Sequence, residues 1–248
     1  MSQTLLDIIY RDDHYIAVHK PSGLFVHPTR LARRQPTCMM MLRNQIGRRV
    51  YPVHRLDRAT SGILTFALDP EAANKMCLLF ERRLVQKGYL AVVRGHTPER
   101  GRIYHALRET PEKDPADAIT EYEREATVEL PLPVGPHPSA RFSLVRAMPL
   151  TGRFHQIRRH FSHVSHPVIG DTTHGDGKQN RFFRDTFCIR RLLLHASDLA
   201  FEHPYSSKPV NIECPVPEEV EALFVELGWA SETLCTTSND KTRGVPTA

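Results

Sequence analysis

The sequence predicts an α+β fold. Short runs rich in β-branched and aromatic residues, typical of strands, recur along the chain, for example at 15–20, 63–68 and 87–95. Among them lie stretches in which apolar residues recur every three or four positions, as in an amphipathic helix. A chain of 248 residues can bury a full-sized core. We therefore expect one domain over 1–230, with a polar, disordered tail over 231–248.

The first half of the chain supplies most of the predicted strands, at 5–10, 15–20, 50–53, 63–68 and 87–95. A short helix is predicted at 37–46, because Gly47 can end it. A second helix is predicted to begin after Asp69, which can cap it, with Pro70 in its first position. The apolar face of this second helix comprises Ala73, Met76, Cys77, Phe80 and Leu84.

The second half opens with an acidic, proline-bearing stretch at 99–129, which we expect to be an exposed insertion with a hairpin-like pair at 102–107 and 118–130. A strand is predicted at 141–148, a basic loop at 175–184, strands at 191–196 and 208–213, and a helix at 218–227. The steps between Phe154, Ile157, Phe161 and Val164 predict one buried helix face, with Arg158 at its edge.

The overall charge favours an anionic partner. The net charge is +5 and the pI is about 9.0, which fits nucleic acid or a membrane surface. No apolar run approaches the length of a transmembrane helix, and charged residues at 7 and 11–13 argue against a signal peptide. Five scattered cysteines without a CxxC pair indicate reduced thiols, so we expect a cytoplasmic protein.

Asp57 is the candidate reactive group. It lies in the turn 54–62, between two predicted strands. From Arg30 to Arg58, all the charged residues apart from Asp57 are arginines. Such a setting favours an ionised carboxylate and suits a polyanionic substrate. Taken alone, however, Asp57 fits a surface turn with arginine–aspartate ion pairs better than it fits an active site.

Other kinds of site are weaker candidates. His160, His163 and His166 have no carboxylate or cysteine placed with them, and adjacent arginines would repel a cation, so we expect no metal. They fit helix-end groups and phosphate contacts instead. The turn around Asp57 is not a kinase catalytic loop, because Leu56 interrupts the motif and Gly62 replaces the required asparagine.

Five stretches together resemble the RluA-type pseudouridine synthases: 15–28, 54–62, 87–95, 151–158 and 192–196. The order of His-Arg-Leu-Asp and Thr-Gly-Arg-x-His-Gln-Ile-Arg is specific to that family. The resemblance implies a mixed, mostly antiparallel central sheet with flanking helices and a central active-site cleft. It also implies isomerisation of uridine to pseudouridine in RNA, without cofactor or metal.

The same resemblance implies roles for individual residues. Asp57 matches the catalytic aspartate. Tyr89 matches the tyrosine that stacks on the target base and is a candidate for the proton step at C5. Arg158 matches the basic residue that pairs with the aspartate. Leu193 would form a wall of the pocket. Whether Asp57 attacks the base, attacks the sugar or removes a sugar proton stays open.

Within the family, the resemblance is greatest to a subgroup that modifies uridine 65 of tRNA and has no N-terminal S4-like domain. The stretches 156–161, 166–176 and 179–181 carry that resemblance. The alternatives are an rRNA pseudouridine synthase and a non-catalytic RNA-binding module. We expect a monomer whose partner is tRNA, with no membrane attachment. The residues expected to contact RNA are Arg33, Arg34, Arg55, Arg58, Arg153, His155, Arg159 and Arg181.

Overall fold

The computed structural model describes residues 5–28, 35–110 and 112–229. Arg33, Arg34 and the predicted tail 231–248 lie outside these ranges. The strands are β1 (Asp7–Arg11), β2 (Tyr15–Lys20), β3 (Tyr51–Pro52), β4 (Ser61–Ala67), β5 (Gln86–Arg94), β6 (Arg100–Tyr104), β7 (Ile119–Leu130), β8 (Ala140–Pro149), β9 (Leu194–Glu202) and β10 (Pro209–Glu213). The helices are α1 (Cys38–Ile46), α2 (Pro70–Glu81), α3 (Gln156–His163), α4 (Gly177–Phe187) and α5 (Glu218–Glu226).

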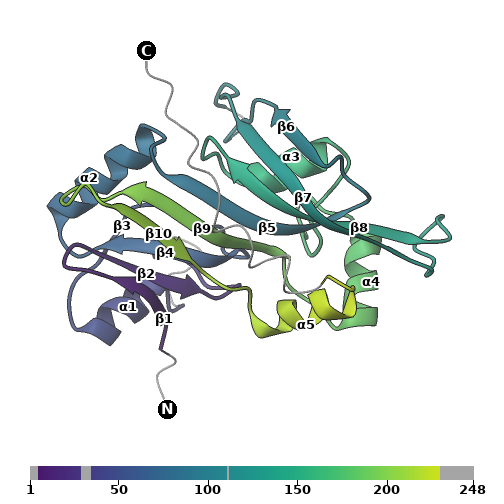
Figure 1. Ribbon diagram of the computed structural model, residues 1–248, viewed down its shortest axis with the longest axis horizontal. Coiled ribbons are helices and arrows are strands. Elements are labelled where there is room, and N and C mark those ends of the chain that lie inside the picture. Colours follow the sequence, from purple (N-terminus) through teal and green to yellow (C-terminus); the bar gives the residue numbers. More distant parts are fainter. Residues whose placement is uncertain (1–4, 29–34, 111, 230–248) are drawn as a thin grey trace.

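One long sheet organises the molecule, with the strand order β1-β2-β4-β9-β5-β8-β7-β6, while β3 pairs with β4 and β10 with β9. Figure 1 shows α1 and α2 beside the β1–β4 half of this sheet and α3, α4 and α5 beside the other half. All the strand pairs of this sheet are antiparallel except β4 with β9. The prediction of an α+β fold with a mixed, mostly antiparallel sheet is confirmed.

The parallel pair joins the two halves at the middle of the sheet. Ser61 pairs with His195, and Gly62 pairs with Ala196. Gly62 has a φ of +109°, and a Cβ atom there would lie 2.2 Å from the carbonyl oxygen of Ala196. Only glycine can adopt that conformation at such a close approach. Gly62 therefore brings the turn that precedes β4 next to the centre of the sheet.

The two faces of the sheet carry different helices. On one face, α1 packs against Ile16 and Leu64, and α3 packs against Ala91 and Val93. On the opposite face, α2 covers the first half, while α4 and α5 cover Leu90 and Val92 in the second half. Tyr89 contacts both clusters of the first face, so it lies between the α1 side and the α3 side of that face.

Both predicted helix starts in the first half are confirmed. Thr37 caps α1 by accepting a hydrogen bond from the backbone of Met40, and Gly47 ends the helix with a φ of +69°. Asp69 caps α2 by accepting from Ala72. However, α2 ends at Glu81, so Leu84 is exposed rather than part of its buried face.

Two expectations for the second half were wrong. The stretch 119–130 is not an exposed insertion, because β7 pairs with β8 along its length and belongs to the central sheet. The hairpin-like pairing expected for 102–107 and 118–130 is confirmed, because β6 pairs with β7. The predicted basic loop contains helix α4, which Asp176 caps by accepting hydrogen bonds from the next turn. Its Phe183 is buried against the sheet, and Phe182 and Phe187 pack beside it. The arginines of this stretch hid that apolar spacing.

The helix containing Arg158 starts later than expected. Its first residue is Gln156, because His155 has a φ of +54° and so interrupts the helical conformation. Ile157 and Phe161 are buried as predicted, but Phe154 lies before the helix and is 44% exposed.

None of the helices in the described ranges is long and apolar enough to cross a membrane.

Candidate active site

Asp57 lies in the turn that connects β3 to β4. β3 and β4 pair through Tyr51–Ala67 and Pro52–Phe66, which confirms the predicted arrangement of strand, charged turn and strand. Leu56 anchors the turn in the core, and the carbonyl of Asp57 accepts a hydrogen bond from the backbone of Thr60. The side chain of Asp57 is 18% exposed, so a ligand can reach it.

A second turn, at 21–23, holds the Asp57 turn in place. The ammonium group of the fully buried Lys20 donates to the carbonyls of Pro21 and Arg58. The hydroxyl of Ser22 donates to the carbonyl of Ala59, and the backbone N–H of Gly23 donates to the carbonyl of Arg58. Burial lowers the pKa of Lys20 to about 8. These bonds fix the backbone directly after Asp57.

His54 of the same motif supports the fold. Its Nε2 atom accepts a hydrogen bond from the backbone N–H of Thr65, at 2.9 Å, and its ring stacks on Phe80. Burial lowers the pKa of His54 to about 3, so the ring is neutral at physiological pH. His54 is therefore a poor candidate for proton transfer.

Arg158 connects Asp57 to a second aspartate. One Nη atom of Arg158 lies 3.2 Å from Asp57 Oδ2, as the resemblance implies. The Nε atom and the other Nη atom each lie 2.7 Å from an oxygen of Asp171. This two-point contact fixes the plane of the guanidinium group. Arg158 thus reaches Asp57 from a fixed position.

Asp171 is itself held in its ionised form. Burial alone would raise its pKa, but hydrogen bonds from Arg158 and from the backbone of His174 and Thr173 lower it below the usual value. Burial would lower the pKa of Arg158, but Asp171 and then Asp57 raise it. The three side chains therefore form a buried chain of alternating charge that ends at Asp57.

Tyr89, on strand β5, is a further residue near Asp57. It pairs across the sheet with Ala147 and Ala196, and it shares a face with Ala91 and Val93 as predicted. Burial, and then the nearby carboxylate of Asp57, raise the pKa of the Tyr89 hydroxyl. Tyr89 is therefore protonated at neutral pH and close to Asp57. A base stacked on its ring would lie beside the carboxylate.

Two histidines complete the surroundings of Asp57. The Nε2 atom of His155 lies 3.8 Å from Asp57 Oδ2, and its Nδ1 atom lies 2.9 Å from Nε2 of His174. Burial lowers the pKa of both rings, against the opposing effects of Asp57 and Asp171 respectively. The structure therefore places His155 beside Asp57, whereas the sequence analysis expected it only to contact RNA.

The other predicted RNA contacts lie on the surface. Arg55, Arg58, Arg153 and Arg181 are exposed, and Arg159 is half-buried. Arg58 also donates to the carbonyl of Gly23 and lies over the ring of Phe25. Arg181 belongs to α4, which packs on the opposite face of the sheet from Tyr89. The structure therefore does not group Arg181 with the others.

The prediction for Leu193 is wrong by one position. Its side chain packs with Leu90 and Val92, on the face of the sheet opposite Tyr89. Leu192 and Leu194 belong instead to the cluster that Tyr89 contacts. Successive side chains of an extended chain point to opposite faces, and the run of three leucines does not show which face each one takes. Leu194 is the nearer counterpart, because it pairs with Ala91.

The histidines that were weighed as metal ligands have other contacts. His160 is fully buried and bonds Thr120 and the carbonyl of His105, so it cannot contact phosphate. His163 stacks on His105. One group in the described ranges has metal-ligand atoms within 4.8 Å of one another: His19, His195 and Cys214. Both ring nitrogens of His195 are already hydrogen-bonded, so a metal would have to displace those bonds.

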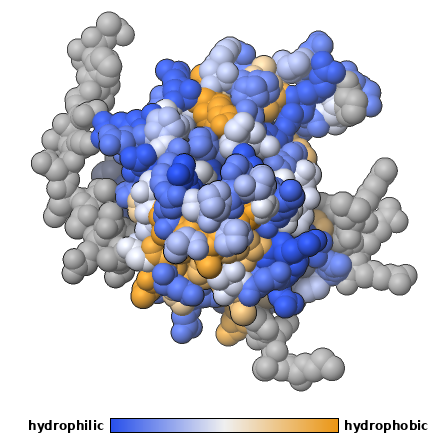
Figure 2. All heavy atoms as spheres, turned by 90° about the vertical axis from the view of Figure 1, so that its right-hand side faces the viewer, coloured by the Kyte–Doolittle hydropathy of each residue, from blue (hydrophilic) through white to orange (hydrophobic). Residues whose placement is uncertain are grey.

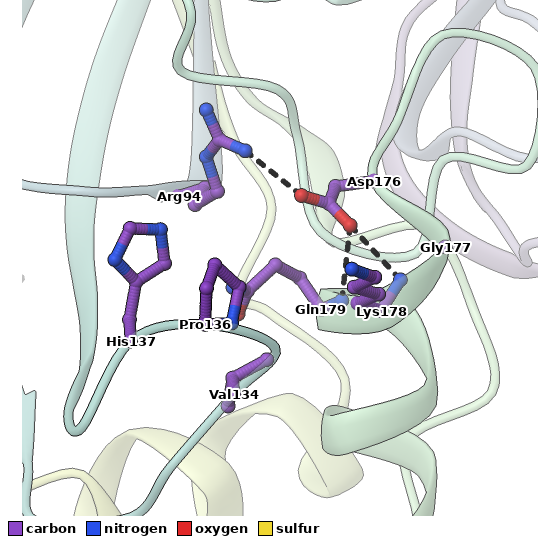
Figure 3. Close-up of a pocket in the computed structure, with 8 residues that line it drawn as sticks. All are labelled: Arg94, Val134, Pro136, His137, Asp176, Gly177, Lys178 and Gln179. Carbon is purple, nitrogen blue, oxygen red and sulfur yellow. Dashed lines mark hydrogen bonds and ion pairs between the residues drawn. The ribbon is translucent and has the colours of Figure 1, made fainter.

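A cavity of about 510 Å³ lies elsewhere, between the turn 134–137 and the start of α4. Figure 3 shows Arg94 and Asp176 paired at its edge, with His137 and Gln179 beside them. Figure 2 shows that this end of the molecule is mostly hydrophilic, with an apolar area at the height of α4 and α5. Asp57, Tyr89 and Arg158 do not line this cavity.

Sequence reasoning missed Lys20, Asp171 and His174. Lys20 stands beside the turn 21–23, and a lysine at the end of a buried strand is unusual, which was a usable signal. Asp171 follows a glycine in a turn, like many surface aspartates. Its contact with Arg158 spans 13 residues, and no local pattern indicates it.

Comparison with known proteins adds to this geometry. Residues 14–163 match the family described as RNA pseudouridylate synthase. The chain is 44% identical to tRNA pseudouridine synthase C of Vibrio vulnificus over 95% of this chain and 100% of that protein. It is 45% identical to tRNA pseudouridine synthase C of Pasteurella multocida over 90% of this chain and 97% of that protein. The solved structure of human RNA Pseudouridylate Synthase Domain Containing 1 is similar with a TM-score of 0.69 and 30% identity, covering 88% of this chain and 86% of that chain.

Proposed function

Because the chain belongs to the RNA pseudouridylate synthase family, we propose that it isomerises uridine to pseudouridine in tRNA, at uridine 65, with Asp57 as the catalytic residue. The names of the similar proteins support tRNA as the substrate. The resemblance of the stretches 156–161 and 166–176 to the uridine-65 subgroup supports the position. Free thiols at the four described cysteines fit the expected location in the cytoplasm.

The observation that carries the proposal is the position of Asp57 at the end of the Arg158–Asp171 chain. A buried arginine held at two points by Asp171 presents its remaining Nη atom to Asp57. That contact orients the carboxylate while leaving part of it accessible. A surface ion pair would need neither the burial nor the second aspartate.

The reaction needs little besides such a carboxylate. The N1–C1′ bond of uridine breaks, the base rotates, and a C5–C1′ bond forms. The proton leaves C5, and N1 of the product carries one, so the atoms balance without any external reactant. Asp57 can act on the base, on the sugar or on a sugar proton, and each of these roles requires the ionised form.

Tyr89 can serve in two ways. Its ring can stack on the uracil beside Asp57, which would offset part of the few kcal/mol that flipping a base costs. Its hydroxyl is protonated at neutral pH, because its pKa is raised. It can therefore accept the C5 proton only while passing its own proton to another base, and the carboxylate of Asp57 is the nearby candidate.

The arginines at the surface around this site, exposed or half-buried, would bind the RNA. Arg55, Arg58, Arg153 and Arg159 are candidates for phosphate contacts, and Arg33 and Arg34 stay predictions because they lie outside the described ranges. Such contacts would make affinity fall steeply with salt. That the chain works as a monomer and without a metal ion also stays a prediction.

Mapping pseudouridines tests the proposal. The purified protein is incubated with an unmodified tRNA transcript, a transcript with cytidine at position 65, and rRNA fragments. We expect pseudouridine at position 65 of the first transcript alone. Modification of rRNA alone would favour the rRNA alternative, and no modification of any RNA would favour a non-catalytic RNA-binding module.

A further inference from the structure

Phe154 is an exposed aromatic side chain at the active site. It is 44% exposed and directly precedes His155, whose ring faces Asp57. The rings of Phe154 and His155 stack with their centroids 3.7 Å apart and an angle of 21° between their planes. Phe154 is therefore one imidazole ring away from the carboxylate. Neither the core nor the Arg158–Asp171 chain requires an aromatic side chain there.

The imidazole ring of His155, on which Phe154 stacks, has a neighbour at each of its two nitrogens. The two nitrogens of His155 face His174, at 2.9 Å, and Asp57, at 3.8 Å. The left-handed conformation of His155 is costly for a residue with a side chain, so its surroundings must impose it.

Gln156 supplies much of that constraint. Its side-chain oxygen accepts hydrogen bonds from the backbone of Arg153 and the hydroxyl of Thr151, and its amide nitrogen donates to the carbonyl of Ile119. Because the bonds of Gln156 fix the loop on one side and the contacts of His155 fix the ring, the Phe154–His155 pair is a preformed platform rather than a mobile loop side chain.

A positive charge lies beside the platform. Arg153 is the neighbouring residue and is exposed. The pKa of Glu109 is lowered mainly by its hydrogen bond to Lys113, and then by the charges of Arg55 and Arg153, so both guanidinium groups lie near that carboxylate. An exposed aromatic ring next to an exposed cation fits a strand of RNA, whose bases stack on the ring while its phosphates contact the cation.

We propose that Phe154, backed by His155, is a stacking site for a nucleobase of the RNA beside the target uridine. The site rests on the proposed function, because it serves the same RNA. It differs from Tyr89, which is mostly buried next to Asp57 and takes the target base itself. A base on Phe154 would be a neighbour whose face is uncovered once the target uridine leaves the stack.

Binding of an unmodified tRNA transcript tests this site in an Asp57→Asn background, which avoids turnover. We expect Phe154→Ala and Phe154→Leu to raise the Kd by about 5- to 150-fold. Phe154→Trp should bind within about threefold of the phenylalanine protein, since tryptophan also stacks. Both losses should be the same at low and high salt, whereas Arg153→Ala should lower the salt slope by about one.

Fluorescence separates stacking from a structural role. The chain has a single tryptophan, Trp229, which is buried, so an added exposed tryptophan gives a distinct signal. The emission of Phe154→Trp should be quenched when tRNA binds. Val225→Trp is the matched control, because Val225 is exposed on α5, which covers the other face of the sheet, and its emission should not change.

Two results would overturn the proposal: Phe154→Leu binding as tightly as the phenylalanine protein, or equal quenching at positions 154 and 225. The failure of the proposed function would look different. In that case the unaltered protein itself would form no pseudouridine in tRNA, whatever residue stands at position 154.

Discussion

Replacing Asp171 by asparagine is expected to weaken the support of Arg158 while leaving the Asp57 side chain itself unaltered. Asparagine keeps an oxygen that can accept the backbone N–H groups of Thr173 and His174, so the turn should persist. It places an NH₂ group, which cannot accept a hydrogen bond, where the Nε atom of Arg158 now finds a carboxylate oxygen. The guanidinium group loses its two-point contact and keeps one bond to the remaining oxygen at position 171 together with the 3.2 Å contact with Asp57.

The magnitude follows from burial. The side chains of Arg158 and Asp171 are 6% and 1% exposed, so the remaining charge cannot be solvated without disturbing the core. Removing one partner of a buried ion pair costs about 3–5 kcal/mol. Because Asp57 still faces Arg158, we expect a value near the lower end, about 3 kcal/mol in the free energy of unfolding. The rate of pseudouridine formation should fall at least tenfold, while the Kd for tRNA changes little.

Urea denaturation and single-turnover pseudouridine formation measure the two effects. Glu219→Gln is the matched control, because Glu219 pairs with Arg191 at 2.9 Å but is 58% exposed. That change should cost less than about 1 kcal/mol and leave the rate unaltered. The reasoning about Arg158 would be refuted if Asp171→Asn were as stable and as active as the unaltered protein.

Two further predictions concern Tyr89 and His195. Tyr89→Phe keeps the ring, so it should slow the reaction while the Kd for tRNA stays within about twofold. Tyr89→Leu should slow the reaction and also weaken tRNA binding. Full activity of the phenylalanine variant would exclude the hydroxyl from the proton step. His195 is 3% exposed, and burial lowers its pKa to about 4, so below pH 6.5 the unfolded chain takes up a proton that the folded chain does not. Stability should therefore fall between pH 6.5 and pH 4, by about 2 kcal/mol at pH 5 from this residue. Urea denaturation at pH 7 and pH 5 checks this: His195→Gln should reduce the loss and His137→Gln, at an exposed position, should not.

Local sequence signals predicted the elements that local chemistry determines. Thr37 and Gly47 delimit α1, Asp69 and Pro70 start α2, and the alternation in β5 correctly assigned Tyr89 to the face of Ala91. Each of these depends on residues within a few positions of one another. The resemblance then added the pairing of Asp57 with Arg158, which spans 101 residues and which no local pattern contains.

The missed features depend on tertiary contacts. The role of Asp171 could not be predicted, because its contact with Arg158 forms only in the folded chain. Leu193 could not be assigned to a face of the sheet from three consecutive leucines. His155 interrupts the helical conformation, although the spacing of Phe154 and Ile157 suggested that the helix continued through it. The strained backbone of His155 lies at the candidate site, where it places the imidazole ring beside Asp57.

The most direct test of the central claim compares Asp57→Asn with the unaltered protein on the same unmodified tRNA transcript. Asparagine keeps the size of the side chain and removes its charge. We expect no pseudouridine at position 65 after long incubation with the variant, while its Kd for the transcript stays within about threefold and its unfolding free energy does not fall. Pseudouridine formation by Asp57→Asn at the rate of the unaltered protein would contradict the assignment of Asp57 as the catalytic residue.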